Sequence, residues 1–157
     1  MPQKPSPEEI DRMHRWFAVE CNNNTWGLID RRNRTETENR DMLYLAYAAA
    51  FHWSKIGAPI NDARADALLA HVHAMLGHAD LSLMYAKRCL FFCENNHAED
   101  WDLAFAHAEL RHAAIAAGDR ALYAKHDALA RKCGESIQAP DDRKVFFDEF
   151  AKLPKLA

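Results

Sequence analysis

Residues 68–90 read LLAHVHAMLGHADLSLMYAKRCL: an apolar, alanine-rich run, a glycine, and a second run of the same kind. On both sides of Gly77 the apolar residues recur every three or four positions, which is the period of an α-helix. A glycine at the end of such a run is typical of the left-handed residue that terminates a helix. This stretch therefore predicts two helices that join at a tight turn and pack antiparallel.

Glycine and proline residues divide the rest of the chain into helical segments in the same way. Its five glycines and six prolines fall almost entirely between segments with helical spacing. Ser6 and Thr35 are each followed three positions later by glutamate, which is the spacing of a capping box. The expected helices span about 7–29 (with a break near 22–24), 36–56, 62–76, 80–95, 99–117, 120–133 and 140–153. Because no strand-like alternation interrupts them, we expect an all-α fold of about seven helices in antiparallel hairpins.

The stretch 51–65, FHWSKIGAPINDARA, is expected to form the corner between two of these helices. Gly57 suits a left-handed residue past a helix end, and Pro59 cannot continue the preceding helix. Asn61 is the expected N-cap of the next helix. The pattern predicts a sharp helix-to-helix turn.

Composition limits the classes of function. A chain of 157 residues with 49% apolar residues is expected to form a single domain. We divide that domain into an N-terminal helix pair (1–60), two helical hairpins (61–134) and a C-terminal capping helix (140–153). The formal charge is −3 and no basic cluster occurs, which disfavours nucleic acid as a partner. No apolar run is long enough for a membrane helix or a secretory leader, so we expect a cytoplasmic protein whose four cysteines are thiols.

A second hairpin follows the first, because residues 103–133 read LAFAHAELRHAAIAAGDRALYAKHDALARKC. Both units contain Tyr-Ala-Lys in their second helix, and together they resemble tetratricopeptide repeats. The residues of the first unit that match this family are Leu69, Ala70, Gly77, Ser82 and Cys89. The second unit departs from the pattern through a shorter turn and through histidines at aromatic positions. Residues 52–64 also resemble a group of bacterial all-helical proteins, which implies no activity.

The resemblance to tetratricopeptide repeats implies a right-handed helical array with a concave face lined by the first helix of each hairpin. The candidate binding residues on that face are Arg64, His71, Phe105, Glu109 and His112. Arg64 and His71 lie two helical turns apart, where a basic pair could hold a carboxylate of a bound peptide. Alternatively, Arg64 pairs with a nearby acid such as Asp62 or Asp66. The resemblance thus implies a protein-binding or peptide-binding module.

A second candidate is a small pocket at the predicted corner, with Trp53 as a wall. His52, Asn61 and Arg64 would be its polar contacts. The alternative for this corner is structural: Trp53 packs against the following helix, and His52 is a hydrogen-bonded residue at a helix end.

Nine histidines raise the question of metal chemistry. Two Glu-x-x-His pairs occur, Glu94 with His97 and Glu109 with His112, but they lie at different levels of an antiparallel hairpin and cannot form a di-metal site. A mononuclear site that uses His52, His107 or His112 stays open. No catalytic constellation is complete, so we expect no catalytic residue, no metal site and no cofactor. The alternative function is a small-ligand or metal-binding bundle, an enzyme included.

The partner expected from these patterns is a protein or peptide, and neither nucleic acid nor a membrane. The phenylalanines of the last predicted helix, Phe146 and Phe150, leave two arrangements open. They either cover the core of the chain or form the interface of a homodimer.

Overall fold

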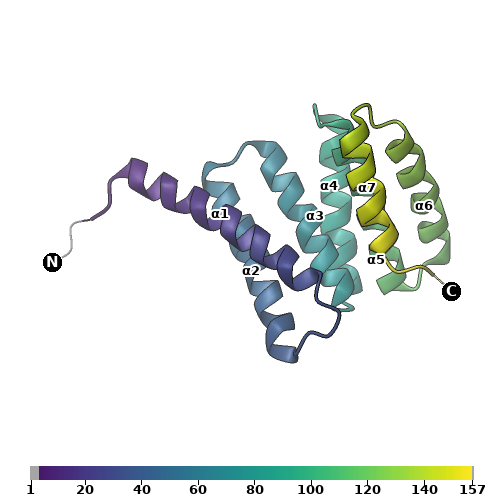
Figure 1. The fold of residues 1–157 in the computed structure, drawn as a ribbon, viewed down its shortest axis with the longest axis horizontal. Coiled ribbons are helices and arrows are strands. Elements are labelled where there is room, and N and C mark those ends of the chain that lie inside the picture. The colour runs from purple at the N-terminus through teal and green to yellow at the C-terminus, as the bar shows by residue number, and fades with distance from the viewer. Residues whose placement is uncertain (1–3, 157) are drawn as a thin grey trace. The chain divides into compact units, whose positions relative to one another are not determined.

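The computed structural model describes residues 4–156, which form seven α-helices and no strand (Figure 1). The helices are α1 (Pro7–Ile29), α2 (Glu36–Ile56), α3 (Pro59–Met75), α4 (Ala79–Asn95), α5 (Asp100–Ala117), α6 (Arg120–Glu135) and α7 (Pro140–Lys152). The all-α prediction is confirmed. Within residues 4–156 no helix has the length and apolar character that crossing a membrane needs.

The helix ends form where local chemistry predicts them. At the start of α1 the Ser6 hydroxyl accepts from the Glu9 N–H, and the Glu9 carboxylate accepts from the Ser6 N–H at 2.7 Å. Thr35 and Glu38 repeat this capping box at the start of α2. Gly77 and Gly118, with φ of 76° and 67°, have the left-handed conformation that ends a helix. The break expected near residues 22–24 is wrong, because α1 is continuous through them.

The corner between α2 and α3 differs from the prediction. Because α3 already begins at Pro59, Asn61 lies in its first turn rather than at the N-cap, and its side chain accepts from the Ala58 N–H at 2.9 Å. Gly57 is extended, with φ −81°, and not left-handed. Instead, a Cβ atom at Gly57 would lie 2.7 Å from the carbonyl oxygen of Trp53. Glycine is required here by the close approach of backbone atoms.

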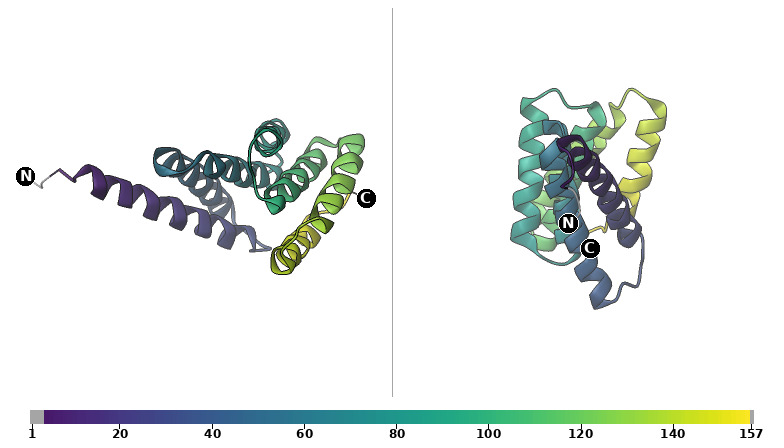
Figure 2. Two further views of the ribbon diagram at one scale, coloured as in Figure 1. Left: turned by 90° about the horizontal axis from the view of Figure 1, so that it is seen from above. Right: turned by 90° about the vertical axis from the view of Figure 1, so that its left-hand side faces the viewer.

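The chain divides into two compact units, with the boundary after Ala65, inside α3. The expected boundary after residue 60 lies close to this point, and the expectation of a single domain stays a prediction. In the first unit α1 packs against α2 as an antiparallel hairpin (Figure 2). The contact between His14 of α1 and His52 of α2 fixes the level at which the two helices meet.

The second unit is built around α5. This helix packs against α4 and α6 and also contacts α7. Its small side chains allow the close packing, and the buried alanines are Ala104, Ala106, Ala108, Ala113 and Ala114. Cys89 and Cys93 of α4 are free thiols buried against Ala106. The alanine content of α5 is therefore explained by the close approach of its neighbouring helices.

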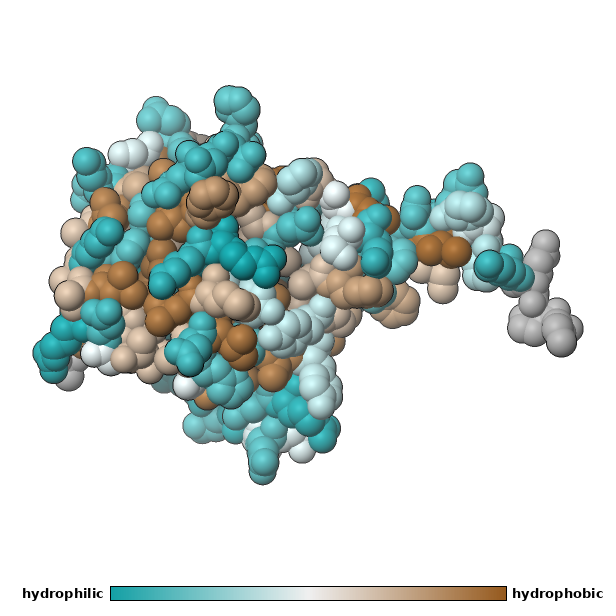
Figure 3. All heavy atoms as spheres, turned by 180° about the vertical axis from the view of Figure 1, so that it is seen from behind, coloured by the Kyte–Doolittle hydropathy of each residue, from teal (hydrophilic) through white to brown (hydrophobic). Residues whose placement is uncertain are grey.

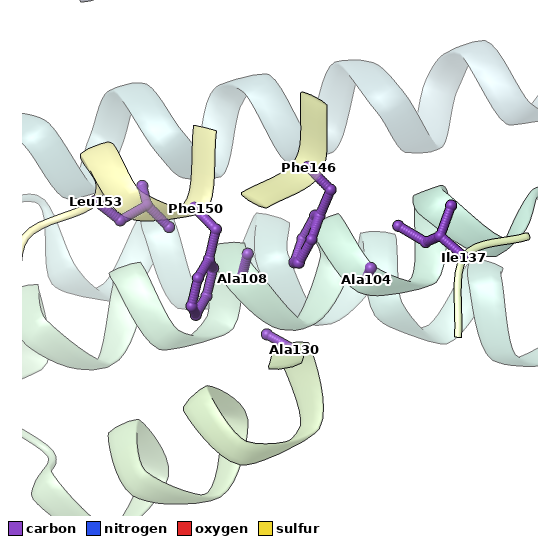
Figure 4. Packing of buried hydrophobic residues seen from close by; sticks show 7 residues of the cluster. All are labelled: Ala104, Ala108, Ala130, Ile137, Phe146, Phe150 and Leu153. Carbon is purple, nitrogen blue, oxygen red and sulfur yellow. The ribbon is translucent and has the colours of Figure 1, made fainter. Parts of the chain in front are cut away.

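The main apolar core of the second unit lies between α5, α6 and α7 (Figure 4). Phe146 and Phe150 of α7 extend into it, and Phe146 is completely buried. The other buried members are Ala104, Ala108, Ala130, Ile137 and Leu153. The phenylalanines of the last helix thus cover the core of their own chain.

A substitution at Gly134 of α6 tests this packing, because a Cβ atom there would lie 2.6 Å from Cδ1 of Phe146. Phe146 is fully buried and cannot move aside. We expect Gly134→Ala to lower the free energy of unfolding by about 1–3 kcal/mol, as overpacking does. Chemical denaturation followed by circular dichroism measures the change.

Gly27→Ala is the matched control. Gly27 also lies inside a helix, but nothing comes within 4 Å of the added Cβ. Alanine is the better helix former, so this variant should gain up to about 1 kcal/mol. A loss of stability in Gly27→Ala, or a gain in Gly134→Ala, would contradict the packing described here.

Candidate functional site

The eight residues predicted for binding lie in several places. His52 and Trp53 belong to α2, Asn61, Arg64 and His71 to α3, and Phe105, Glu109 and His112 to α5. The structure brings together His71, Glu109 and His112. Phe105 instead packs edge-on against Phe146, with ring centroids 5.0 Å apart. It therefore belongs to the apolar core.

His71, Glu109 and His112 form a compact polar cluster in the second unit, which we call the His–Glu–His cluster. Nδ1 of His71 lies 3.0 Å from Oε1 of Glu109. Nδ1 of His112, one turn further along α5, lies 3.8 Å from Oε2 of Glu109, which is too far for a hydrogen bond. One side-chain atom from each residue can be chosen so that all three lie within 4.8 Å of one another.

The cluster is buried, with exposed fractions of 8% for His71, 5% for Glu109 and 4% for His112. Burial alone would raise the pKa of Glu109, but the neighbouring His71 and His112 lower it to about 2. Burial also lowers the pKa of His112, and the interaction with Glu109 opposes this only in part. At neutral pH the cluster therefore holds an ionised carboxylate inside the protein.

Two atoms of the cluster lack a hydrogen bond. Among the described residues, Oε2 of Glu109 and Nδ1 of His112 are the buried side-chain atoms for which no partner is found. Leaving a buried polar atom unpaired costs about 1–3 kcal/mol, and native proteins contain few such atoms. The hydrogen-bond network within the cluster is thus incomplete at one side.

This burial bears on the predicted concave groove. A bound peptide needs exposed side chains, whereas these three are enclosed. The carboxylate beside His71 comes from Glu109 of the same chain and not from a ligand. Asp66, considered as an ion partner of Arg64, lies 3.2 Å from Nε of Arg88. The contacts of His71, Glu109 and His112 therefore give no support to a groove at this position.

Two of the polar residues expected at the corner pocket, His52 and Asn61, make contacts within the chain. The His52 ring stacks on Phe17 at a centroid distance of 5.2 Å, so it faces the α1–α2 contact. Trp53 is half-buried, and the Asn61 side chain is bonded to the backbone at Ala58. The hydrogen bond of His52 to His14 matches the structural alternative stated for His52.

Sequence reasoning missed that most of the histidines occur in pairs. Three pairs join Nδ1 to Nδ1: His14 with His52 at 2.8 Å, His73 with His78 at 3.0 Å, and His107 with His126 at 3.0 Å. In each such bond one ring donates and the other accepts, so the pair cannot form when both rings are protonated. The partners of two pairs lie 38 and 19 residues apart, and no local pattern connects them.

The His107–His126 pair predicts an effect of pH on stability. Burial, with smaller contributions from His107 and Lys125, lowers the pKa of His126 to about 4. Between pH 6.5 and 4 the unfolded chain therefore binds the additional proton, and stability falls as the pH falls. From pH 7 to pH 5 we expect this residue to account for about 1–2 kcal/mol of lost stability.

Urea unfolding of the wild type and of His126→Gln at both pH values measures this difference. The loss should be smaller in the variant by that amount. His97→Gln is the control, because His97 does not belong to any of the three histidine pairs. Equal losses in all three proteins would show that the pair does not control acid stability.

Comparisons of the chain with protein-family models, with curated proteins and with solved structures found no match. The function therefore has to be argued from the geometry of the molecule itself.

Proposed function

We propose that the protein is a protein-binding helical module and that the first half of α1 supplies its binding surface. The observation that carries this proposal is the exposure of large apolar side chains there. Trp16 is 59% exposed and Met13 is 51% exposed, and Phe17 and Ile10 are exposed in part. Apolar surface appears in brown along α1 among hydrophilic residues (Figure 3). Contiguous exposed apolar side chains of this kind are typical of interaction sites.

The α1–α2 hairpin leaves the start of α1 unpaired. His14 of α1 lies opposite His52 of α2, and the two helices are antiparallel. The residue four positions before His14 therefore lies opposite the residue four positions after His52, which is Ile56, the last residue of α2. Residues 7–9, less than one turn of α1, extend beyond α2, whereas Met13, Trp16 and Phe17 lie within the paired part and are exposed on its surface.

The exposed side chains lie on one face of α1, which we call the α1 face: Glu9, Arg12, Met13, Trp16 and Phe17. They recur at three- and four-residue intervals, so they point the same way. With Lys4, Pro5 and Ser6 they line an open hollow of about 840 Å³. A hollow of this size has room for several side chains of a partner. An aromatic centre flanked by charges is the composition expected of an interface.

The partner that fits this face best is a second copy of the chain. Glu9 lies nearer the N-terminus of the face and Arg12 lies one turn later. When two such helices pair antiparallel with the two-fold axis between residues 10 and 11, Glu9 of each copy comes opposite Arg12 of the other. Such a two-fold contact buries the same apolar residues in both copies, as in most homodimers.

A concave groove of the tetratricopeptide kind has less support as the binding surface. Three of the five residues expected to line it belong to the buried His–Glu–His cluster. We therefore propose protein binding through α1 and not through α3 and α5.

We expect the wild type to dimerise and the variant Met13→Ser/Trp16→Ser to be a monomer. Each large apolar side chain contributes about 1.5–3 kcal/mol when it is buried, so losing two should weaken the dimer at least about 100-fold. Sedimentation velocity over a range of concentrations measures the dissociation constant. Arg12→Glu should also weaken the dimer, because it places two acids opposite each other.

Phe91→Ser is the matched control, since Phe91 of α4 is 69% exposed and lies outside the α1 face. It should dimerise as the wild type does. A wild type that stays monomeric at about 0.2 mM, where a micromolar dimer would be nearly complete, would refute pairing between copies. Dimers of unchanged affinity in Met13→Ser/Trp16→Ser would refute the α1 face.

A further inference from the structure

The His–Glu–His cluster offers two imidazole nitrogens and a carboxylate at the spacing of ligands around one metal ion. The ligand atoms lie within 4.8 Å of one another. Around a tetrahedral Zn²⁺ with bonds near 2.1 Å, neighbouring ligand atoms are about 3.4 Å apart. The two measured separations from the Glu109 carboxylate, 3.0 Å and 3.8 Å, lie on either side of this value. Small side-chain rotations would bring all three atoms to bonding distance of a common centre.

An ion pair between His71 and Glu109 explains only part of the cluster. It uses one carboxylate oxygen and one imidazole, at 3.0 Å. The other carboxylate oxygen and Nδ1 of His112 stay buried without a hydrogen bond. A cation between these two atoms would satisfy both at once, whereas the ion pair alone leaves the cost of two unpaired atoms. The unpaired atoms thus favour a third component in the cluster.

We propose that His71, Glu109 and His112 bind a divalent transition-metal ion of the Zn²⁺ class. Two imidazoles with one carboxylate suit Zn²⁺, while Mg²⁺ and Ca²⁺ prefer oxygen ligands throughout. Three protein ligands leave one position of a tetrahedral ion for a water molecule. The proposal is independent of dimerisation through the α1 face, because its residues belong to the other compact unit.

The neighbouring cysteines do not compete for this ion. A hydrogen bond with Cys93, together with burial, raises the pKa of the Cys89 thiol, and the charges of Glu109 and Asp66 raise it further. Among the described residues, the side chains within metal-binding reach of one another are His71, Glu109 and His112, and neither cysteine belongs to that group. The ion should therefore have nitrogen and oxygen ligands from the protein.

The sequence predicts no metal site, although a mononuclear site that includes His112 stays open. Glu109 and His112 form a Glu-x-x-His pair, and the chain has no second such pair at the same level for a di-metal site. The third ligand is instead His71, a single residue of α3 that lies 38 positions before Glu109. A single histidine from a neighbouring helix leaves no spacing signal.

The test uses the full chain without an affinity tag, treated with a chelator and then titrated with ZnCl₂ in a calorimeter. The wild type should bind one Zn²⁺ per chain with a dissociation constant in the micromolar range or below. His112→Leu should weaken binding at least about 100-fold, because even residues that only orient a metal ligand contribute 10–100-fold. Co²⁺ in place of Zn²⁺ should give the visible absorption of a tetrahedral site without a thiolate charge-transfer band.

Two controls separate loss of a ligand from loss of the fold. Without metal, His112→Leu should be as stable as the wild type, since an apolar side chain replaces an unpaired polar atom. Glu109→Gln removes a second ligand and should also bind Zn²⁺ weakly. Because two variants test the site, the result stands even if one of them is unstable. His126→Gln changes a histidine outside the cluster and should bind as the wild type does.

The proposal is overturned if the wild type shows no saturable one-to-one binding. It is equally overturned if His112→Leu and Glu109→Gln both bind Zn²⁺ as tightly as the wild type. Loss of binding in His126→Gln alone would place the ion at the His107–His126 pair instead. A thiolate band with Co²⁺ would place it at Cys89 and Cys93.

Discussion

The second unit depends on one buried cation, the guanidinium of Arg111. It is 1% exposed, and three of its five N–H groups donate to neighbouring segments. It donates to Asp127 of α6 at 2.6 Å, to the Tyr123 hydroxyl at 2.9 Å and to the Pro154 carbonyl oxygen at 3.0 Å. The ring of Phe150 lies 4.8 Å from it. Removing a partner from such a charge costs about 3–5 kcal/mol, so α6 and the segment after α7 are fixed against α5 by the same group.

Arg111 and Glu109 are two charged residues that α5 buries on different sides of the helix. Arg111 and Glu109 are two residues apart on α5, so their side chains leave the helix on different sides. Arg111 pairs with Asp127, and the carboxylate of Glu109 lies beside the ring of His71. Neither charge could be buried unless helices covered both sides of α5. The many alanines of α5 make that possible, because they let α4 and α6 approach closely enough to enclose the polar groups between them.

The sequence predicts the helices well and their mutual contacts poorly, for a physical reason. Ser6, Thr35, Gly77 and Gly118 act through atoms within four residues of themselves, and their roles are confirmed. Gly57 acts through a close approach of other atoms, which its own conformation does not reveal. Glu109 and His112 were expected on the same concave face as His71, and they lie beside it, but their burial depends on the whole packing. A pattern that predicts which residues face one another does not tell whether an open groove or a closed contact lies between them.

The proposed metal site would contribute to the free energy of folding of the second unit, whereas the proposed α1 face would contribute to the free energy of association. An ion in the His–Glu–His cluster would have no open path for a substrate, since its three ligands are each less than one tenth exposed. Its binding energy would then be added to folding, as in structural metal sites. The α1 face is already exposed, so its burial contributes to association and not to the stability of the single chain. Metal would thus raise the stability of the second unit at any protein concentration. Pairing through α1 would stabilise the first unit more as the protein concentration rises.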